Sequence, residues 1–211
     1  MAHQVEVQFQ DAEQQKHAAE LGMWTFMASE VLFFSGLFAL FAAYRAQYGD
    51  EFLRAAAHTS MPLGTANTFI LLTSSFFVAA AIYAVKAGWP RKRAQWFIGG
   101  TILLGVVFLG LKLLEYAEHI REGLSPGPFY ANEELPERGA HVFFNLYYVM
   151  TGIHALHVTA GIILMTWLFI LLRRNRLDRE YYTPLELGGI YWHFVDIVWV
   201  FLWPLFYLLR R

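Results

Sequence analysis

Cysteine is absent from this sequence of 211 residues. Without a thiol, the chain can form no disulfide, no thiolate metal site, no c-type haem linkage and no cysteine nucleophile. Charged residues are scarce as well, at 16% against the roughly 25% that is typical of soluble domains. The formal net charge is only −1, so nothing favours a nucleic-acid partner. A cleavable signal peptide is not expected, because residues 1–21 are polar throughout.

What the sequence has in excess is apolar surface. Hydrophobic residues make up 57% of the chain, aromatic residues make up 18%, and the mean hydropathy is +0.37. A water-soluble domain of this size could not bury so much apolar surface, so the bilayer is the expected solvent. Five stretches approach the roughly 20 residues that a membrane-spanning helix needs: residues 22–43, 64–85, 95–116, 142–172 and 187–209.

These stretches carry no alternating strand pattern, and backbone polar groups in lipid must be satisfied within the segment. The sequence therefore predicts an all-α integral membrane protein with a bundle of five transmembrane helices. We expect one membrane domain over residues 1–211, in which residues 1–21 form a polar N-terminal segment and residues 22–211 form the five-helix part.

The distribution of Lys and Arg among the loops predicts the orientation. The loops on the side of the N-terminus carry nine of these residues, and the loops on the other side carry six. The N-terminal segment is therefore expected in the cytoplasm and the C-terminus outside.

Ionisable residues inside spans are costly in lipid, so each is a functional hypothesis with an internal partner. Glu30 shares its helical face with Phe26, Phe34 and Phe41. Desolvation among these rings predicts a protonated carboxyl group, which could hold a proton, address a bound lipid or act only as packing glue.

Lys112, Glu115 and His119 lie at i, i+3 and i+7 on one face of the third span. This spacing favours an ion pair between Lys112 and Glu115 within the helix. His154 and His157, at i and i+3 in the fourth span, could supply half of a metal site, but the sequence offers no defined third ligand. We expect these polar faces to contact protein rather than lipid, so that the chain would be unstable without a partner.

His193 and Asp196 lie one turn apart in the last span. Asp196 is therefore predicted to accept a hydrogen bond from the imidazole of His193 within the same helix. Trp192, Trp199 and Trp203 form an adjacent stripe that favours helix contacts. The residues alone predict buried acids and imidazoles, but no complete catalytic constellation.

Four blocks of the sequence resemble subunit III of the haem-copper oxidases. They are MASEVLFFSGLF around Glu30, KLLEYAEH around Glu115, GIHALHVTAGIIL, and YWHFVDIVWVFLW. The blocks follow the family's order and extend over residues 21–207, and the combination of HxxHVxxG with YWHFVDxVW is specific. The larger family form has seven helices. This chain lacks the first two and is similar to the short, five-helix form of many bacterial cytochrome c and quinol oxidases.

The resemblance implies a non-redox subunit III of a proton-pumping terminal oxidase, which oxidises cytochrome c and reduces O2 to water in a bacterial inner membrane. It implies no catalytic or metal-binding residue on this chain, since haem and copper belong to subunits I and II. Those subunits, a small subunit IV and membrane phospholipid are the implied partners, and cytochrome c or quinol docks on other subunits. The implied roles are assembly, lipid binding, proton uptake and sustained turnover.

The resemblance also implies which residues matter. The family's buried carboxylate corresponds to Glu30, the acid of its EY motif to Glu115, and its paired histidines to His154 and His157. The first two helices form one wall of the family's lipid cleft, and a partner subunit could supply that wall here.

Other functions remain open from the sequence. Within the class, they are subunit III of a quinol oxidase and the accessory subunit of a nitric oxide reductase. Outside the class, they are a free-standing membrane enzyme with a histidine-ligated haem or metal, and a proton-coupled carrier. A carrier is typically built from internal repeats or broken helices, and Pro204 is the one mild irregularity of that kind in the sequence.

Overall fold

The computed structural model describes residues 7–209, and all regular elements in this range are helices. They are α1 (Ala12–Gln47), α2 (Gly49–Ala57), α3 (Met61–Lys86), α4 (Arg91–Arg121), the 3-10 turn η1 (Gly127–Phe129), α5 (Arg138–Arg173) and α6 (Thr183–Tyr207). Five of them, α1, α3, α4, α5 and α6, are long and apolar enough to cross a membrane. The predicted all-α fold with five spans is confirmed.

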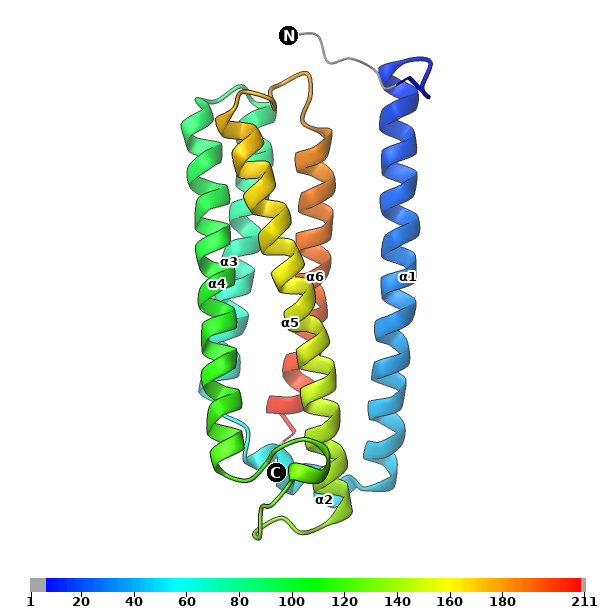
Figure 1. The fold of residues 1–211 in the computed structure, drawn as a ribbon, viewed down its shortest axis with the longest axis vertical. Coiled ribbons are helices and arrows are strands. Elements are labelled where there is room, and N and C mark those ends of the chain that lie inside the picture. The colour runs from blue at the N-terminus through cyan, green and yellow to red at the C-terminus, as the bar shows by residue number, and fades with distance from the viewer. Residues whose placement is uncertain (1–6, 210–211) are drawn as a thin grey trace.

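The five long helices do not form one uniform bundle (Figure 1). Helices α3, α4, α5 and α6 form a bundle, whereas α1 stands at its side and packs against α5 and α6. The short helix α2 lies at the end of the bundle where α1 finishes and α3 begins. We call this the α2 end and the opposite one the N-terminal end. The start of α1 and the end of α6 lie toward opposite ends of the molecule, as an odd number of passes requires.

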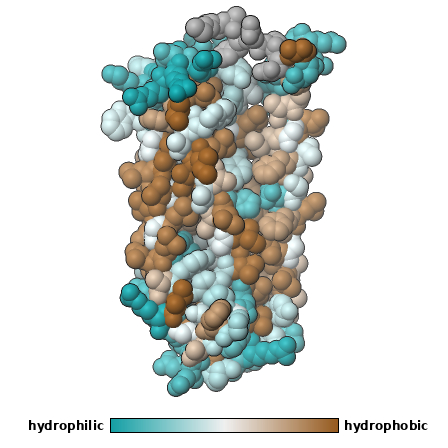
Figure 2. All heavy atoms as spheres, viewed as in Figure 1, coloured by the Kyte–Doolittle hydropathy of each residue, from teal (hydrophilic) through white to brown (hydrophobic). Residues whose placement is uncertain are grey.

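The surface is zoned along the long axis. Figure 2 shows hydrophobic residues over the middle of the molecule and hydrophilic residues at both ends. The loops at the N-terminal end carry the basic runs around Arg91–Arg93 and Arg173–Arg176, as the orientation prediction assumed. An apolar belt between polar ends is the pattern that a bilayer selects.

The helices extend beyond the predicted spans at most boundaries. Helix α1 begins at Ala12 rather than at residue 22, because the Asp11 carboxylate caps it by accepting from the amide of Gln14 at 2.7 Å. Lys16 and Glu20 then pair one turn apart at 3.6 Å on its first turns. Helix α6, by contrast, ends at Tyr207, two residues before the predicted boundary. Helix α2 was not predicted at all.

Three of the long helices end in a left-handed residue. Gly88, Gly123 and Asn175 have φ values of 71°, 76° and 56° after α3, α4 and α5. After each of them, the next amide bonds back to a carbonyl of the last helical turn, as in a Schellman motif. These sharp ends stop the helices cleanly, and the connections that follow α3, α4 and α5 are 4, 16 and 9 residues long.

Glycines allow the large side chains of α6 to enter the bundle. The indole of Trp192 lies between Gly105 of α4 and Gly161 of α5, and a Cβ atom at either glycine would approach that ring to 2.9 Å. Trp192 also donates to the hydroxyl of Ser74 at 3.0 Å. At the α2 end, a Cβ atom on Gly64 would lie 2.7 Å from the ring of Tyr207. The positions of both aromatic rings therefore depend on bare backbone opposite them.

Candidate functional site: polar groups inside the bundle

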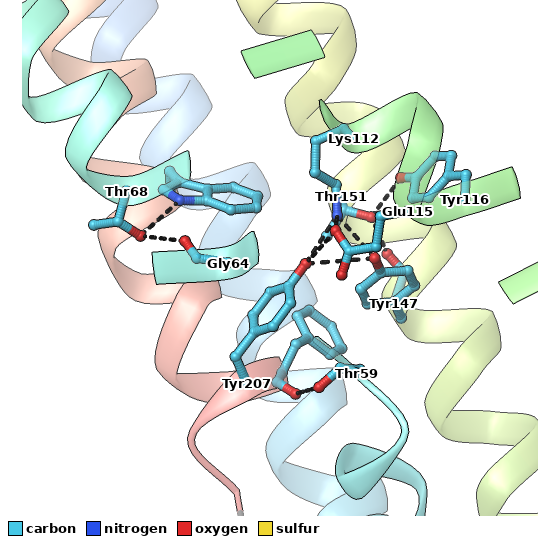
Figure 3. A network of polar contacts seen from close by, with 11 residues as sticks. Thr59, Gly64, Thr68, Lys112, Glu115, Tyr116, Tyr147, Thr151 and Tyr207 are labelled. Atoms are coloured by element: carbon cyan, nitrogen blue, oxygen red, sulfur yellow. Dashed lines mark hydrogen bonds and ion pairs between the residues drawn. The ribbon is translucent and has the colours of Figure 1, made fainter. Parts of the chain in front are cut away.

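The most extensive polar contact in the core surrounds Lys112 of α4 (Figure 3). Its ammonium group donates to Glu115 Oε2 at 2.8 Å, to the Tyr147 hydroxyl at 2.8 Å and to the Tyr207 hydroxyl at 2.9 Å. Tyr207 in turn donates to the same Glu115 oxygen at 2.9 Å. The predicted pairing of Lys112 with Glu115 is confirmed, and tyrosines from α5 and α6 complete it. We call these four residues the Lys112 network.

Burial and aromatic rings isolate this network from solvent. Only 3% of the Lys112 side chain and 1% of the Glu115 side chain are exposed. The ammonium lies 4.7–5.6 Å from the ring centroids of Tyr116, Tyr147, Trp199 and Tyr207. All three donor positions of the ammonium are used, which offsets the cost of burying the charge.

The sequence predicted that these polar faces would contact protein. They do, but the protein is this chain itself, because α5 and α6 supply the partners of Lys112. That the chain is unstable without a partner stays a prediction. Thr151 of α5 extends the Lys112 network. Its hydroxyl group lies 2.5 Å from that of Tyr116 on α4 and donates to the Tyr147 carbonyl at 2.5 Å.

A second acid–base pair joins α1 to α5. Glu30 Oε2 lies 3.0 Å from Nε2 of His157, and each side chain is 19% exposed. His157 Nδ1 lies 2.9 Å from the carbonyl of Ile153 and therefore donates to it, so Nε2 is the atom that meets Glu30. A single contact between an acid and a base therefore links the side chains of α1 and α5.

Phenylalanines surround this pair as the sequence predicted, but with one difference. Phe34 is buried and packs edge-on against the His157 ring at 5.3 Å, and Phe41 is buried farther along α1. Phe26 is instead 41% exposed and stacks on Tyr191, which donates to the His157 carbonyl at 3.0 Å. The apolar surroundings are therefore open on one side.

His154 and His157 do not act together. His157 points toward α1, whereas His154 is 1% exposed and lies in the core, 5.3 Å from the Trp199 ring and 5.7 Å from that of Phe108. Neither nitrogen of His154 has a partner among the described residues. Between residues 7 and 209, no group of three or more His, Asp or Glu side chains is placed to hold a metal ion.

His193 and Asp196 are not bonded as the sequence predicted. His193 Nδ1 lies 2.6 Å from the hydroxyl of Ser75 on α3, and the same hydroxyl contacts the Asp196 carboxyl group. Ser75 thus stands between the two residues, because side chains one turn apart on α6 both lean toward the neighbouring helix. The tryptophan stripe beside them is largely buried, and Trp199 donates to Thr68 at 3.1 Å.

Two grooves flank α1. One, of about 280 Å³, opens toward the N-terminal end and is lined by Glu20, Trp24, Ile82, Thr183, Glu186, Leu187, Gly189, Ile190 and His193. The other, of about 670 Å³, lies nearer the α2 end between α1 and α6 and is lined by Phe38, Phe41, Ala42, Arg45, Ala46, Phe201 and Leu205. Arg45 is the one charged residue in this second, apolar lining.

Sequence reasoning missed the partners that come from distant helices. Tyr207, Ser75 and Thr151 bear hydroxyl groups in apolar spans, which is a weak signal because such groups also bond their own backbone. The link between Glu30 and His157 joins two residues that were each singled out, yet no local pattern relates positions 127 residues apart.

These features define a multi-pass helical membrane protein whose ionisable residues are mostly paired in its interior. The sequence profile of cytochrome c oxidase subunit III matches residues 3–210. The chain belongs to this family.

Individual relatives agree with the family assignment. A cytochrome c oxidase subunit 3 from Thermostichus vulcanus is 34% identical over 192 residues, which cover 90% of this chain and 87% of the relative. A probable quinol oxidase subunit 3 from Staphylococcus aureus strain USA300 is 31% identical over 196 residues, covering 90% and 88%. The resemblance inferred from the sequence is confirmed: the chain is subunit III of a haem-copper oxidase, a non-catalytic part of an oxidoreductase complex.

Proposed function

We propose that this subunit III packs against the catalytic subunit I of a proton-pumping oxidase in a bacterial inner membrane and sustains its turnover. Subunit II and a small subunit IV are further partners, and haem and copper reside in the partner subunits. The electron donor, cytochrome c or quinol, docks elsewhere on the complex. The observation that carries this proposal is the pair formed by Glu30 and His157.

Glu30 and His157 lie where they can interact with a lipid or a partner subunit next to α1. Helix α1 is the least enclosed span, with 17% of its most apolar window buried in the chain, against 28–50% for the other four. Glu30 and His157 lie where α1 meets α5, and both keep part of their surface open. A partly exposed acid–base pair in an apolar belt can exchange a proton with the lipid or protein that covers α1, or form a hydrogen bond with it. The Lys112 network has no such opening beside α1, because its Lys112 and Glu115 side chains are only 3% and 1% exposed.

The apolar groove between α1 and α6 supports a bound phospholipid. Its lining of Phe38, Phe201 and Leu205 fits an acyl chain, and Arg45 at the same groove fits a phosphate. A lipid here would cover the part of α1 that the bundle leaves free.

The groove at the N-terminal end supports a role in proton uptake. Glu20, Glu186 and His193 bring two carboxylates and an imidazole to one recess, at the end of the molecule expected in the cytoplasm. Carboxylates gathered in one recess create a negative local potential, which raises the local concentration of protons.

Glu30→Gln in the assembled oxidase tests the proposal. The haem spectrum and the initial turnover rate should stay as in the wild type, because the haem lies in another subunit. The number of turnovers before inactivation should fall several-fold, because the amide can no longer exchange a proton with His157. Glu118→Gln is the matched control, since Glu118 is exposed on α4 and lies outside both polar pairs. An altered haem spectrum, or an endurance equal to that of the control, would contradict the proposed role of Glu30.

A further inference from the structure

Two polar atoms at the α2 end of the Lys112 network have no hydrogen-bond partner in the described chain. They are Oε1 of Glu115 and Nδ1 of His119, which lie one turn apart on α4. Both residues are buried, with 1% and 3% of their surface exposed. Buried polar atoms are nearly always bonded, to protein or to an ordered water molecule.

The bonds made by the other atoms of these two side chains fix what the free atoms can do. Glu115 Oε2 already accepts from Lys112 and Tyr207, so Oε1 is a remaining acceptor. The backbone of His58, next to α2, lies close to the His119 ring. In the neutral tautomer that carries its proton on Nε2, the ring presents Nδ1 as an acceptor too.

Two neighbouring acceptors cannot bond each other, but a molecule with two hydrogens to donate can bond both. Water is the smallest such molecule and fits a buried site with polar partners. The charged and titratable groups around this point are Lys112 and Tyr116 on α4, Tyr147 on α5 and Tyr207 on α6, together with the imidazole of His58, which follows α2. His58 and Tyr116 are only partly buried, and of these two His58 is the one that lies outside the spans, at the α2 end.

We propose that a water molecule binds between Oε1 of Glu115 and Nδ1 of His119 and donates one hydrogen to each. The site is the inner end of a route from the surface, which runs past the partly exposed His58 to His119 and then to the water. The Lys112 network is therefore closed to the membrane and to the N-terminal end, but it exchanges hydrogen with the aqueous phase at the α2 end.

High-resolution density of the assembled wild-type oxidase gives the first test. A peak within hydrogen-bonding distance of both Glu115 Oε1 and His119 Nδ1 is expected. A direct contact between the two side chains, or no peak in a region where other buried waters are resolved, would overturn the proposal. This measurement needs no variant and does not depend on how a substitution folds.

Radiolytic labelling of the same complex after rapid mixing with H2¹⁸O gives the second test. Tyr147, whose ring lies 5.2 Å from that of His119, should acquire ¹⁸O within seconds although it is fully buried. Trp192, which is 1% exposed and bonded to Ser74, should acquire none and serves as the internal control. A Tyr147 signal as low as that of Trp192 would overturn the water site.

Two variants separate the site from its route. His119→Phe keeps the ring contacts with Phe144 and Tyr147 but removes the acceptor, so both the density peak and the Tyr147 labelling should be lost. His58→Leu keeps the backbone carbonyl, so the peak should remain while ¹⁸O labelling slows at least ten-fold. His141→Leu, at the same end but stacked on Tyr130, is the control and should leave labelling unchanged. Unslowed labelling in His58→Leu would overturn the route through His58.

Discussion

The Lys112 network and the pair of Glu30 with His157 both place a carboxyl group inside a membrane-spanning helix, yet their surroundings differ. Glu115 is 1% exposed and belongs to a network of side chains from α4, α5 and α6, whereas Glu30 is 19% exposed and has one side-chain partner. Removing a member of the first leaves a charge deep in the core. Removing a member of the second leaves a group that lipid or a partner subunit can still reach. The same chemistry is therefore structural in one region and available for function in the other.

The largest effect is expected from Lys112→Met. The substitution leaves the Glu115 carboxylate buried without its cation, which typically costs about 3–5 kcal/mol. The yield of assembled oxidase and its Tm should both drop sharply. The double variant Lys112→Met with Glu115→Leu should recover most of the loss, because it removes both buried charges. If the single and double variants were equally unstable, the ion pair would not be the cause.

Gly64→Ala should disturb the same network indirectly. The added Cβ atom would lie 2.7 Å from the Tyr207 ring, and overpacking of this kind costs about 1–3 kcal/mol. Tm should fall, and the displaced Tyr207 should lose its bonds to Lys112 and Glu115. Gly110→Ala on α4 is the control, since that position faces open space and alanine favours a helix. An equally large fall in Tm for Gly110→Ala would show that the displacement of Tyr207 is not the cause.

A hydrophobic carbodiimide sharpens the comparison between the two carboxyl groups without any substitution. The reagent enters from lipid and attacks protonated carboxyl groups, so it should modify Glu30 well before Glu115 or the loop carboxylates. Peptide mass spectrometry of the labelled oxidase measures the ratio. His157→Phe should increase labelling further, because the imidazole then no longer occupies Oε2 of Glu30 and the reagent can reach that oxygen. Preferential labelling of Glu115 would reverse the assignment of the open and closed regions.

The smallest effect is expected at Asp196. Asp196→Asn should change the free energy of unfolding by less than about 1 kcal/mol, because Ser75 rather than Asp196 bonds His193. Ser75→Ala should cost more, roughly 1–2 kcal/mol, since it leaves the His193 nitrogen without its partner. Thermal unfolding of the assembled complex compares the two variants. A larger loss of stability in Asp196→Asn than in Ser75→Ala would instead support a direct bond between His193 and Asp196.

Much of the fold and part of the site follow from local sequence. Five apolar runs of spanning length predict five helices, and the i, i+3 spacing of Lys112 and Glu115 predicts their ion pair. The start of α1 at Ala12 was missed because hydropathy does not detect a polar helical extension, although Asp11 followed by a polar run is a capping signal. Helix α2 was missed because nine residues are too few to show a period clearly.

The rest depends on which helices become neighbours, and sequence spacing does not contain that information. Tyr207 reaches Glu115 across 92 residues, and Ser75 reaches His193 across 118. The spacing of His154 and His157 predicted a shared site, but a rotation of about 60° around the helix sends one to the core and the other to α1. Which residues pair is decided by the packing of α6 between α3 and α5.

The isolated place of α1 also has a consequence for how the protein is made. Helix α1 leaves the ribosome first, whereas α5, which carries His157, begins 91 residues after α1 ends, at Arg138 as against Gln47. At about 5–20 residues per second, translation takes roughly 5–18 s to bridge that interval. During this time Glu30 sits in the membrane with no imidazole to meet it. The nascent chain must therefore shelter a lone carboxyl group, protonated or held by the insertion machinery, until the second half of the protein arrives.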